Sequence, residues 1–272
     1  MHKKLTTIFT LAIVLLSTSL ANAAFVADDM QSMLFVRLYG ERTEQQPDPT
    51  QIQLKYARFL YGFFAASDES LNAQYDMAQK YGLDCGLDEE EVLEWAGNFV
   101  QHWGFLCKGV SLEEQARRAC LFCMDEEGLG LDQASANEWA QKFMKRRASF
   151  HSDLLFDYQC EQALGAASQL GLTGDVAKSW ASEVVRLNGY IYRDCSLIEQ
   201  FKKTMVVVES HFGLSAYEAY VWTATFMLRR GRPLENKTLF ELYAEARAFA
   251  LSSDGLGLEP EGAKRWAQDY VS

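Results

Sequence analysis

The chain has 272 residues, of which 49% are hydrophobic, 13% aromatic and 23% charged, and its formal net charge is −11. This composition supplies enough apolar side chains for a buried core, and it excludes disorder as the main state of the chain. The negative charge makes nucleic acids and anionic lipid surfaces unfavourable partners, because both repel it at long range.

Residues 1–23 have the pattern of a secretory signal peptide. Lys3 and Lys4 precede a short apolar run over residues 8–16, and Ala21-Asn22-Ala23 has the small-x-small cleavage pattern. An uncleaved membrane anchor is the alternative, but it needs roughly 20 apolar residues, more than this run offers. We therefore expect cleavage after Ala23 and an exported protein, either periplasmic or secreted.

Residues 24–69 are predicted to form a degenerate helical hairpin. Its first helix is expected before residue 46, and Pro47-Asp48-Pro49-Thr50 separates it from a second one. This second helix contains Tyr56-Ala57-Arg58-Phe59, which resembles the Trp-Ala-x-x-Phe sequence found further along the chain. An irregular first hairpin is typical of a terminal unit that caps a stack of repeats.

A Gly-Leu pair recurs five times over residues 70–272, and each time the Leu stands eight positions before a Trp. The five pairs are Leu87 with Trp95, Leu131 with Trp139, Leu172 with Trp180, Leu214 with Trp222, and Leu258 with Trp266. Successive Trp residues are 44, 41, 42 and 44 positions apart. The constant offset predicts five repeats with a period of about 42 residues.

Capping residues divide each repeat into two helices. Capping boxes that open the first helix are predicted at Ser111 with Glu114, Ser196 with Glu199, and Thr238 with Glu241. N-caps of the second helix are predicted at Asp88, Asp132, Thr173, Ser215 and Glu259, the last followed by Pro260. The Gly of each Gly-Leu pair is expected to stop the first helix in the left-handed conformation, with the Leu folding back on it. We expect the Leu and Trp residues to form the core of the repeat.

The repeat is similar, at the level of class, to the tetratricopeptide and HEAT group of helical repeats, from Ser70 to the end of the chain. Tetratricopeptide units have 34 residues, and their Trp-x-x-Leu-Gly-x-x-Tyr pattern is absent here. The resemblance implies an all-α protein, an α-solenoid of five to six helix-turn-helix repeats. It transfers no functional residue to this chain.

The six cysteines all follow the predicted signal peptide, so an oxidising compartment favours disulfides among them. Cys120 and Cys160 stand at similar heights on consecutive first helices, and Cys85 and Cys123 stand near the ends of such helices. We predict these two pairs and leave Cys107 and Cys195 unassigned.

The cysteines have two other possible uses. The spacing of His102, Cys107, Cys120 and Cys123 resembles a zinc set, but Cys107 precedes the helix that begins at Ser111, whereas Cys120 and Cys123 lie roughly 13 to 18 Å along it. Cys120 and Cys123 also have the spacing of a redox pair, yet they lie towards a helix C-terminus, where the dipole raises a thiol pKa. We therefore predict neither a metal site nor a cofactor.

Charges are segregated within each repeat. Acidic residues gather at the turn between the two helices, whereas basic residues gather near the end of the second helix. The basic set comprises Lys145, Arg146, Arg147, Arg186, Arg229, Arg230 and Arg232. Complementation of helix dipoles explains this distribution, and the functional alternative is a basic rim that binds a partner.

No catalytic motif is recognisable, and His102, His151 and His211 occupy unrelated positions of the repeat. The leading hypothesis is a scaffold that binds an unknown protein or peptide partner. One alternative is an inhibitor or immunity-type protein that binds a basic partner. Another is a toroidal polysaccharide-active enzyme, with Tyr190, Tyr192, Tyr217 and Tyr220 around a pocket.

Overall fold

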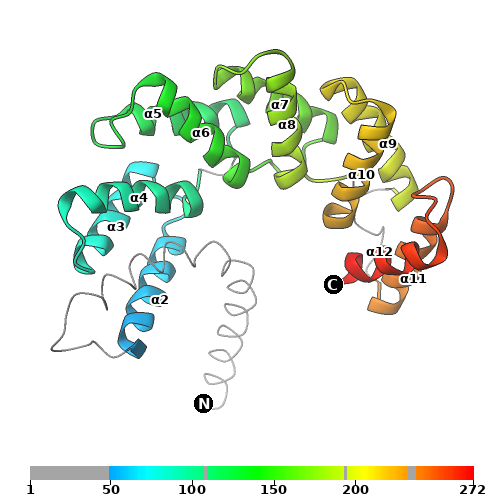
Figure 1. Cartoon of the computed structure of the whole chain (residues 1–272), viewed down its shortest axis with the longest axis horizontal. Helices are drawn as coiled ribbons and strands as arrows, with labels where there is room; N and C mark the ends of the chain where they lie inside the picture. Colours follow the sequence, from blue (N-terminus) through cyan, green and yellow to red (C-terminus); the bar gives the residue numbers. More distant parts are fainter. Residues whose placement is uncertain (1–48, 107–108, 193–194, 232–236) are drawn as a thin grey trace. The chain divides into compact units, whose positions relative to one another are not determined.

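The computed structural model describes residues 49–106, 109–192, 195–231 and 237–272 (Figure 1). All the helices assigned in these ranges are α-helices and no strand is assigned there, which confirms the predicted all-α class. The predicted signal peptide, the first predicted helix, Cys107 and Arg232 lie outside the described residues. Within the described ranges, no helix is both long enough and apolar enough to cross a membrane.

The helices are α2 (Pro49–Ala65), α3 (Leu71–Asp84), α4 (Glu89–Trp103), α5 (Leu112–Met124), α6 (Gln133–Arg147), α7 (Phe156–Gln169), α8 (Gly174–Asn188), α9 (Leu197–Phe212), α10 (Ala216–Arg230), α11 (Leu239–Leu251) and α12 (Pro260–Val271). From α5 onward, consecutive helices pack as hairpins: α5 with α6, α7 with α8, α9 with α10, and α11 with α12.

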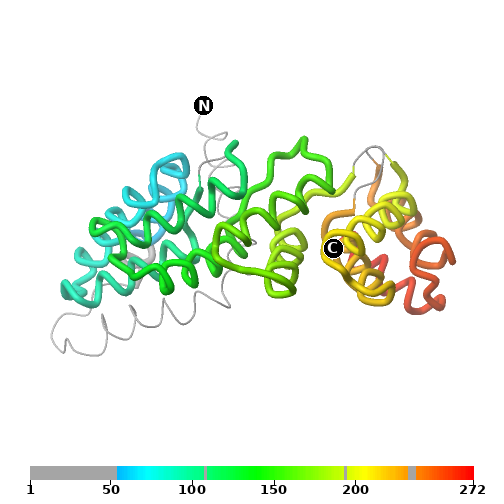
Figure 2. The backbone as a smooth tube through the Cα atoms, turned by 90° about the horizontal axis from the view of Figure 1, so that it is seen from above, coloured from blue at the N-terminus to red at the C-terminus, as the bar shows by residue number. Residues whose placement is uncertain are grey.

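The chain divides into two compact units, one of residues 1–64 with 76–96 and one of residues 65–75 with 97–272. In the first unit, the Phe59 and Tyr81 rings stack with centroids 4.1 Å apart, and Trp95 lies 6.4 Å from Phe59. In the second unit, the first helix of each hairpin packs on the first helix of the next, α5 on α7, α7 on α9 and α9 on α11 (Figure 2). The second helices α6, α8, α10 and α12 follow the same order.

The glycine is left-handed at all five Gly-Leu pairs, but the predicted helix stop is confirmed only at Gly86, Gly171 and Gly213. The prediction is wrong at the other two pairs, because α5 already ends at Met124 and α11 at Leu251, before Gly130 and Gly257. Gly86, Gly130, Gly171, Gly213 and Gly257 all have positive φ, between 57° and 91°. This left-handed conformation ends a helix at little cost only for a residue without a Cβ. The chain then folds back, since Leu131 N donates to Cys123 O at 2.8 Å and Leu258 N donates to Ala250 O at 2.8 Å. The five Leu side chains of these pairs are half-buried.

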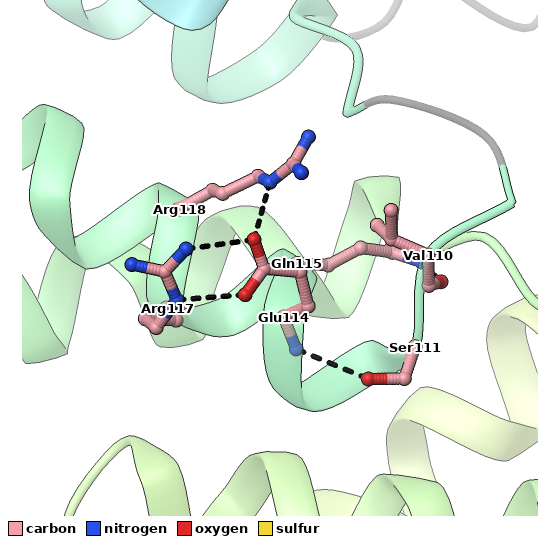
Figure 3. A network of polar contacts seen from close by, with 6 residues as sticks. All are labelled: Val110, Ser111, Glu114, Gln115, Arg117 and Arg118. Atoms are coloured by element: carbon pink, nitrogen blue, oxygen red, sulfur yellow. Dashed lines mark hydrogen bonds and ion pairs between the residues drawn. The ribbon is translucent and has the colours of Figure 1, made fainter.

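Most predicted caps form, with three exceptions. Complete capping boxes occur at Ser196, Ser215 and Thr238. Ser111 accepts the Glu114 amide, but the Glu114 carboxylate binds Arg117 and Arg118, each at 2.7 Å, which lowers its pKa to about 2 (Figure 3). Thr173 and Glu259 stand at their predicted N-cap positions but make no side-chain capping bond. Local spacing therefore predicted where the helices start more reliably than it predicted which side-chain hydrogen bonds cap them.

The small residue after each Trp is more deeply buried than the Trp itself. These residues are Ala96, Ala140, Ala181, Thr223 and Ala267, and all are 0% exposed. Trp95 and Trp180 are buried, whereas Trp139, Trp222 and Trp266 are half-buried. Trp139 stacks on Phe143 with centroids 5.1 Å apart, and Trp266 stacks on Tyr270 at 5.3 Å. The small residues thus permit the close approach of helices, and the Trp rings border that contact.

Candidate binding surface

Part of the predicted basic rim makes internal contacts. Arg147 Nε donates to Gly104 O at 2.8 Å, and its guanidinium lies 4.6 Å from the Phe105 ring centroid. Arg230 Nη2 donates to Leu187 O at 2.5 Å. Both bonds span 43 residues, so each joins the end of one second helix to the end of the preceding one. Burial lowers the pKa of Arg147.

Other side chains at these helix ends form similar links. Lys145 pairs with Glu183 at 2.6 Å, and Tyr270 Oη donates to Gly231 O at 3.0 Å. Tyr270 therefore occupies, in the last hairpin, the role that an arginine has in earlier ones. Among the rim residues that the structure describes, Arg146, Arg186 and Arg229 are still candidates for contact with a partner.

Neither predicted disulfide is formed in the structure. Cys85, Cys120, Cys123 and Cys160 carry free thiols. Cys120 Sγ donates to Asn137 Oδ1 at 3.4 Å, so it faces the second helix of its own hairpin rather than α7. Similar height on consecutive helices was therefore not sufficient to predict a pair, because it does not fix the direction of the side chain.

Cys123 and Cys160 are expected to be alkylated at least ten-fold more slowly in the native protein than in urea. Both side chains are fully buried, and burial raises both thiol pKa values. Because the thiolate is the nucleophile, a raised pKa and exclusion of the reagent act in the same direction. Mass mapping after timed iodoacetamide labelling measures each rate, and the more exposed Cys85 serves as the internal control. Equal native and unfolded rates would contradict this assignment.

His102, His211 and Tyr220 each contact a backbone carbonyl oxygen. His102 Nδ1 lies 2.8 Å from Asn98 O and His211 Nδ1 lies 3.1 Å from Val207 O, both within their own helices. Tyr220 Oη donates to Leu256 O at 2.6 Å, and Tyr217 is 77% exposed. Among the described residues, no group of three His, Cys, Asp or Glu side chains is placed to hold a metal ion.

Four buried glutamines were missed by the sequence analysis. Gln74, Gln115, Gln159 and Gln200 are each 0% exposed and stand at the same position of four successive first helices. Their spacings of 41, 44 and 41 residues match the period of the repeat. A polar residue that recurs at one position of an apolar helix face was therefore the signal that could have identified them.

Gln74, Gln115 and Gln159 each hold an extended connection at the start of their own hairpin. Gln115 Nε2 donates to Val110 O at 3.0 Å and to Ser149 O at 2.7 Å, and Gln115 Oε1 accepts from Ser149 N at 3.0 Å. Gln74 binds Phe105 through the same pair of bonds, and Gln159 binds Tyr190 likewise. The segment that follows the second helix is thus held beside the N-terminus of the first.

Two open pockets lie beside these fastened connections. The first, which we call the Leu106 pocket, has a volume of about 390 Å³ and is lined by Asp68, Glu69, Ser70, Leu71, Asn72, Phe105, Leu106, Arg118, Leu121, Phe122 and Asp125. The second, the Ile191 pocket, has a volume of about 430 Å³ and is lined by Ser152, Asp153, Leu154, Leu155, Phe156, Ile191, Tyr192, Cys195 and Lys203.

Charges in the Leu106 pocket are partly paired. Asn72 Nδ2 donates to Asp125 Oδ2 at 3.1 Å, and Arg118 Nε lies 2.7 Å from Glu114 Oε1. Asp68 and Glu69 add two further carboxylates to the lining. The pocket therefore combines an apolar floor with an excess of negative charge.

In the Ile191 pocket, the Lys203 ammonium lies 5.6 Å from the Tyr192 ring centroid. Burial first, and then the nearby Asp157 carboxylate, raise the pKa of Tyr192 to about 12. The hydroxyl therefore stays protonated at neutral pH and is not poised as a base or nucleophile.

Comparisons of the chain with protein-family models, with curated proteins and with solved structures gave no significant match.

Proposed function

We propose that the protein is an exported α-solenoid of five to six helical hairpins, with a period of about 42 residues, that binds a protein or peptide partner. The stacking of first helices on first helices and of second helices on second helices supports the solenoid. The apparent signal peptide over residues 1–23 supports export to the periplasm or the medium.

The observation that carries the binding role is the pair of open pockets beside the fastened connections. Each is built from the connection of one hairpin and the first helix of the next, so the stacking of hairpins creates it. Leu155 is 65% exposed at the Ile191 pocket and Leu121 is 47% exposed at the Leu106 pocket. Exposed leucines beside a partly apolar cavity favour contact with another chain.

An inhibitor or immunity-type role is a narrower form of the same proposal. The net charge of −11 and the three carboxylates of the Leu106 pocket favour a basic partner. The toroidal enzyme has less support, since only Tyr192 of the four tyrosines named for it lines a described pocket.

Selection from a random-peptide display library tests the proposed function. The full-length chain is immobilised, and the same chain after reduction, alkylation and unfolding serves as the control. We expect peptide families that bind the folded chain and are not enriched on the unfolded one. If no family is selectively enriched, peptide binding is contradicted.

A further inference from the structure

Part of the lining of the two pockets corresponds at a separation of 85 positions. The corresponding residues include Asp68 and Asp153, Leu71 and Phe156, Leu106 and Ile191, and Arg118 and Lys203. An offset of 85 residues equals two hairpins, because Gln74 and Gln159 are also 85 apart. The two pockets therefore lie at the same position of the repeat, two hairpins apart.

Packing alone does not explain the charges of these pockets. The buried residue at the start of the first helix recurs in four successive hairpins, as Leu71, Leu112, Phe156 and Leu197. The charges do not recur in this way: the intervening position of the repeat has Gly109 where the two pockets have an aspartate, and Gln162 where they have a cation. Charges that skip one position of the repeat, while the core does not, point to a use outside the fold.

We propose, building on the binding function above, that the two pockets are equivalent subsites for one extended, positively charged peptide that inserts an apolar side chain into each. The floor of each subsite is apolar and fixed, since Leu106 and Ile191 are both only 6% exposed. Leu121 and Leu155 are the exposed walls that an inserted side chain would cover.

The charged side chains of the two pockets determine which peptide residues they favour. The Leu106 pocket has Asp68, Glu69 and Asp125 against Arg118, whose guanidinium is already paired with Glu114. In the Ile191 pocket, Asp153 and the adjoining Asp157 outnumber the single ammonium of Lys203. Both subsites therefore favour lysine or arginine beside the inserted apolar side chain.

Helix packing sets the spacing of the two inserted side chains. The Leu106 pocket lies at the start of α3 and on α5, and the Ile191 pocket lies at the start of α7 and on α9, so the two are two first helices apart. Packed helices are separated by about 8–10 Å, which gives roughly 20 Å between the subsites. An extended chain covers that distance in about six residues.

Fluorescence anisotropy with a designed probe tests the proposal on the full-length chain. The probe is a fluorescein-labelled peptide of alternating lysine and serine with two leucines six residues apart. Matched probes have glutamate for lysine, or serine for one leucine. We expect the two-leucine lysine probe to bind at least ten-fold more tightly than either matched probe, because two linked contacts reinforce each other.

Variants of the protein locate the site. Leu121→Ser and Leu155→Ser each remove an apolar wall without adding charge, and each is expected to weaken binding of the two-leucine probe at least ten-fold. Val176→Ser, at a residue 63% exposed on α8 and outside both pockets, is the control and should leave binding unchanged. Leu121→Ala and Leu155→Ala, milder changes at the same positions, serve if either serine variant alters the circular dichroism spectrum.

Several results would overturn the proposal. Equal binding of the glutamate probe would contradict the charge assignment, and equal loss in Val176→Ser would contradict the location. Display-selected peptides that bind regardless of both leucine variants would leave the binding function intact and remove the twin subsites. Failure of the display selection itself would instead remove the binding function.

Discussion

Replacement of Gln115 by leucine is expected to lower the free energy of unfolding by about 3 kcal/mol. The side chain is fully buried and satisfies Val110 O, Ser149 O and Ser149 N together. Leucine has a similar size but no polar atoms, so these backbone groups would lose a partner where water enters poorly. A buried polar group without a partner costs about 1–3 kcal/mol, so the expected loss of stability is larger than the small change in side-chain volume would cause.

Urea unfolding followed by circular dichroism measures the effect. Gln169→Leu, the same change at the exposed end of α7, is the matched control and should alter stability by less than about 0.5 kcal/mol. Similar losses in both variants would show that the buried amide has no special role. A loss confined to Gln115→Leu would support the fastened connection as a main determinant of hairpin stacking.

The contrast between the glycines and the glutamines shows what could be predicted from sequence. The three confirmed Gly-Leu stops and the caps at Ser196, Ser215 and Thr238 depend on residues within a few positions of one another, so local spacing identified them. The bonds of Gln74 and Gln159 reach backbone groups 31 residues away. The residues near each glutamine in the sequence do not indicate such a distant partner. Only the recurrence of glutamine at the period of the repeat could have indicated it.

The difference between local and long-range contacts also explains why the prediction for the charged residues was only partly correct. Basic residues at the ends of second helices were correctly linked to helix termini, but Arg147 and Arg230 reach the carbonyl groups of the preceding hairpin rather than those of their own helix. Charge segregation along the sequence thus reflected contacts between hairpins. The two pockets were missed because their lining comes from residues about 50 positions apart, which the packing of first helices brings together.

A second large effect is expected from Gly128→Ala, which should destabilise the protein by about 3 kcal/mol. A Cβ at this position would lie 1.9 Å from Phe122 O, a backbone atom within the last turns of α5. Leu129 N donates to the same oxygen at 3.3 Å, so the turn wraps closely over that carbonyl. Gly255 stands in the corresponding turn after α11, with its Cβ position 2.1 Å from Phe249 O. The second glycine of the local Gly-Leu-Gly-Leu sequence takes the left-handed conformation after the helix has ended, whereas the first is required for this close approach.

Gly262→Ala is the matched control, and it should raise stability by about 0.5–1 kcal/mol. Gly262 lies inside α12, and the atom nearest to its Cβ position is 3.6 Å away, an ordinary contact. The same added methyl group therefore helps where the backbone is helical and the space is open, and harms where a carbonyl occupies that space. Thermal or urea unfolding of the two variants side by side would show changes of opposite sign. If Gly128→Ala matched the parent protein, the turn after α5 would not need the close approach that the structure shows.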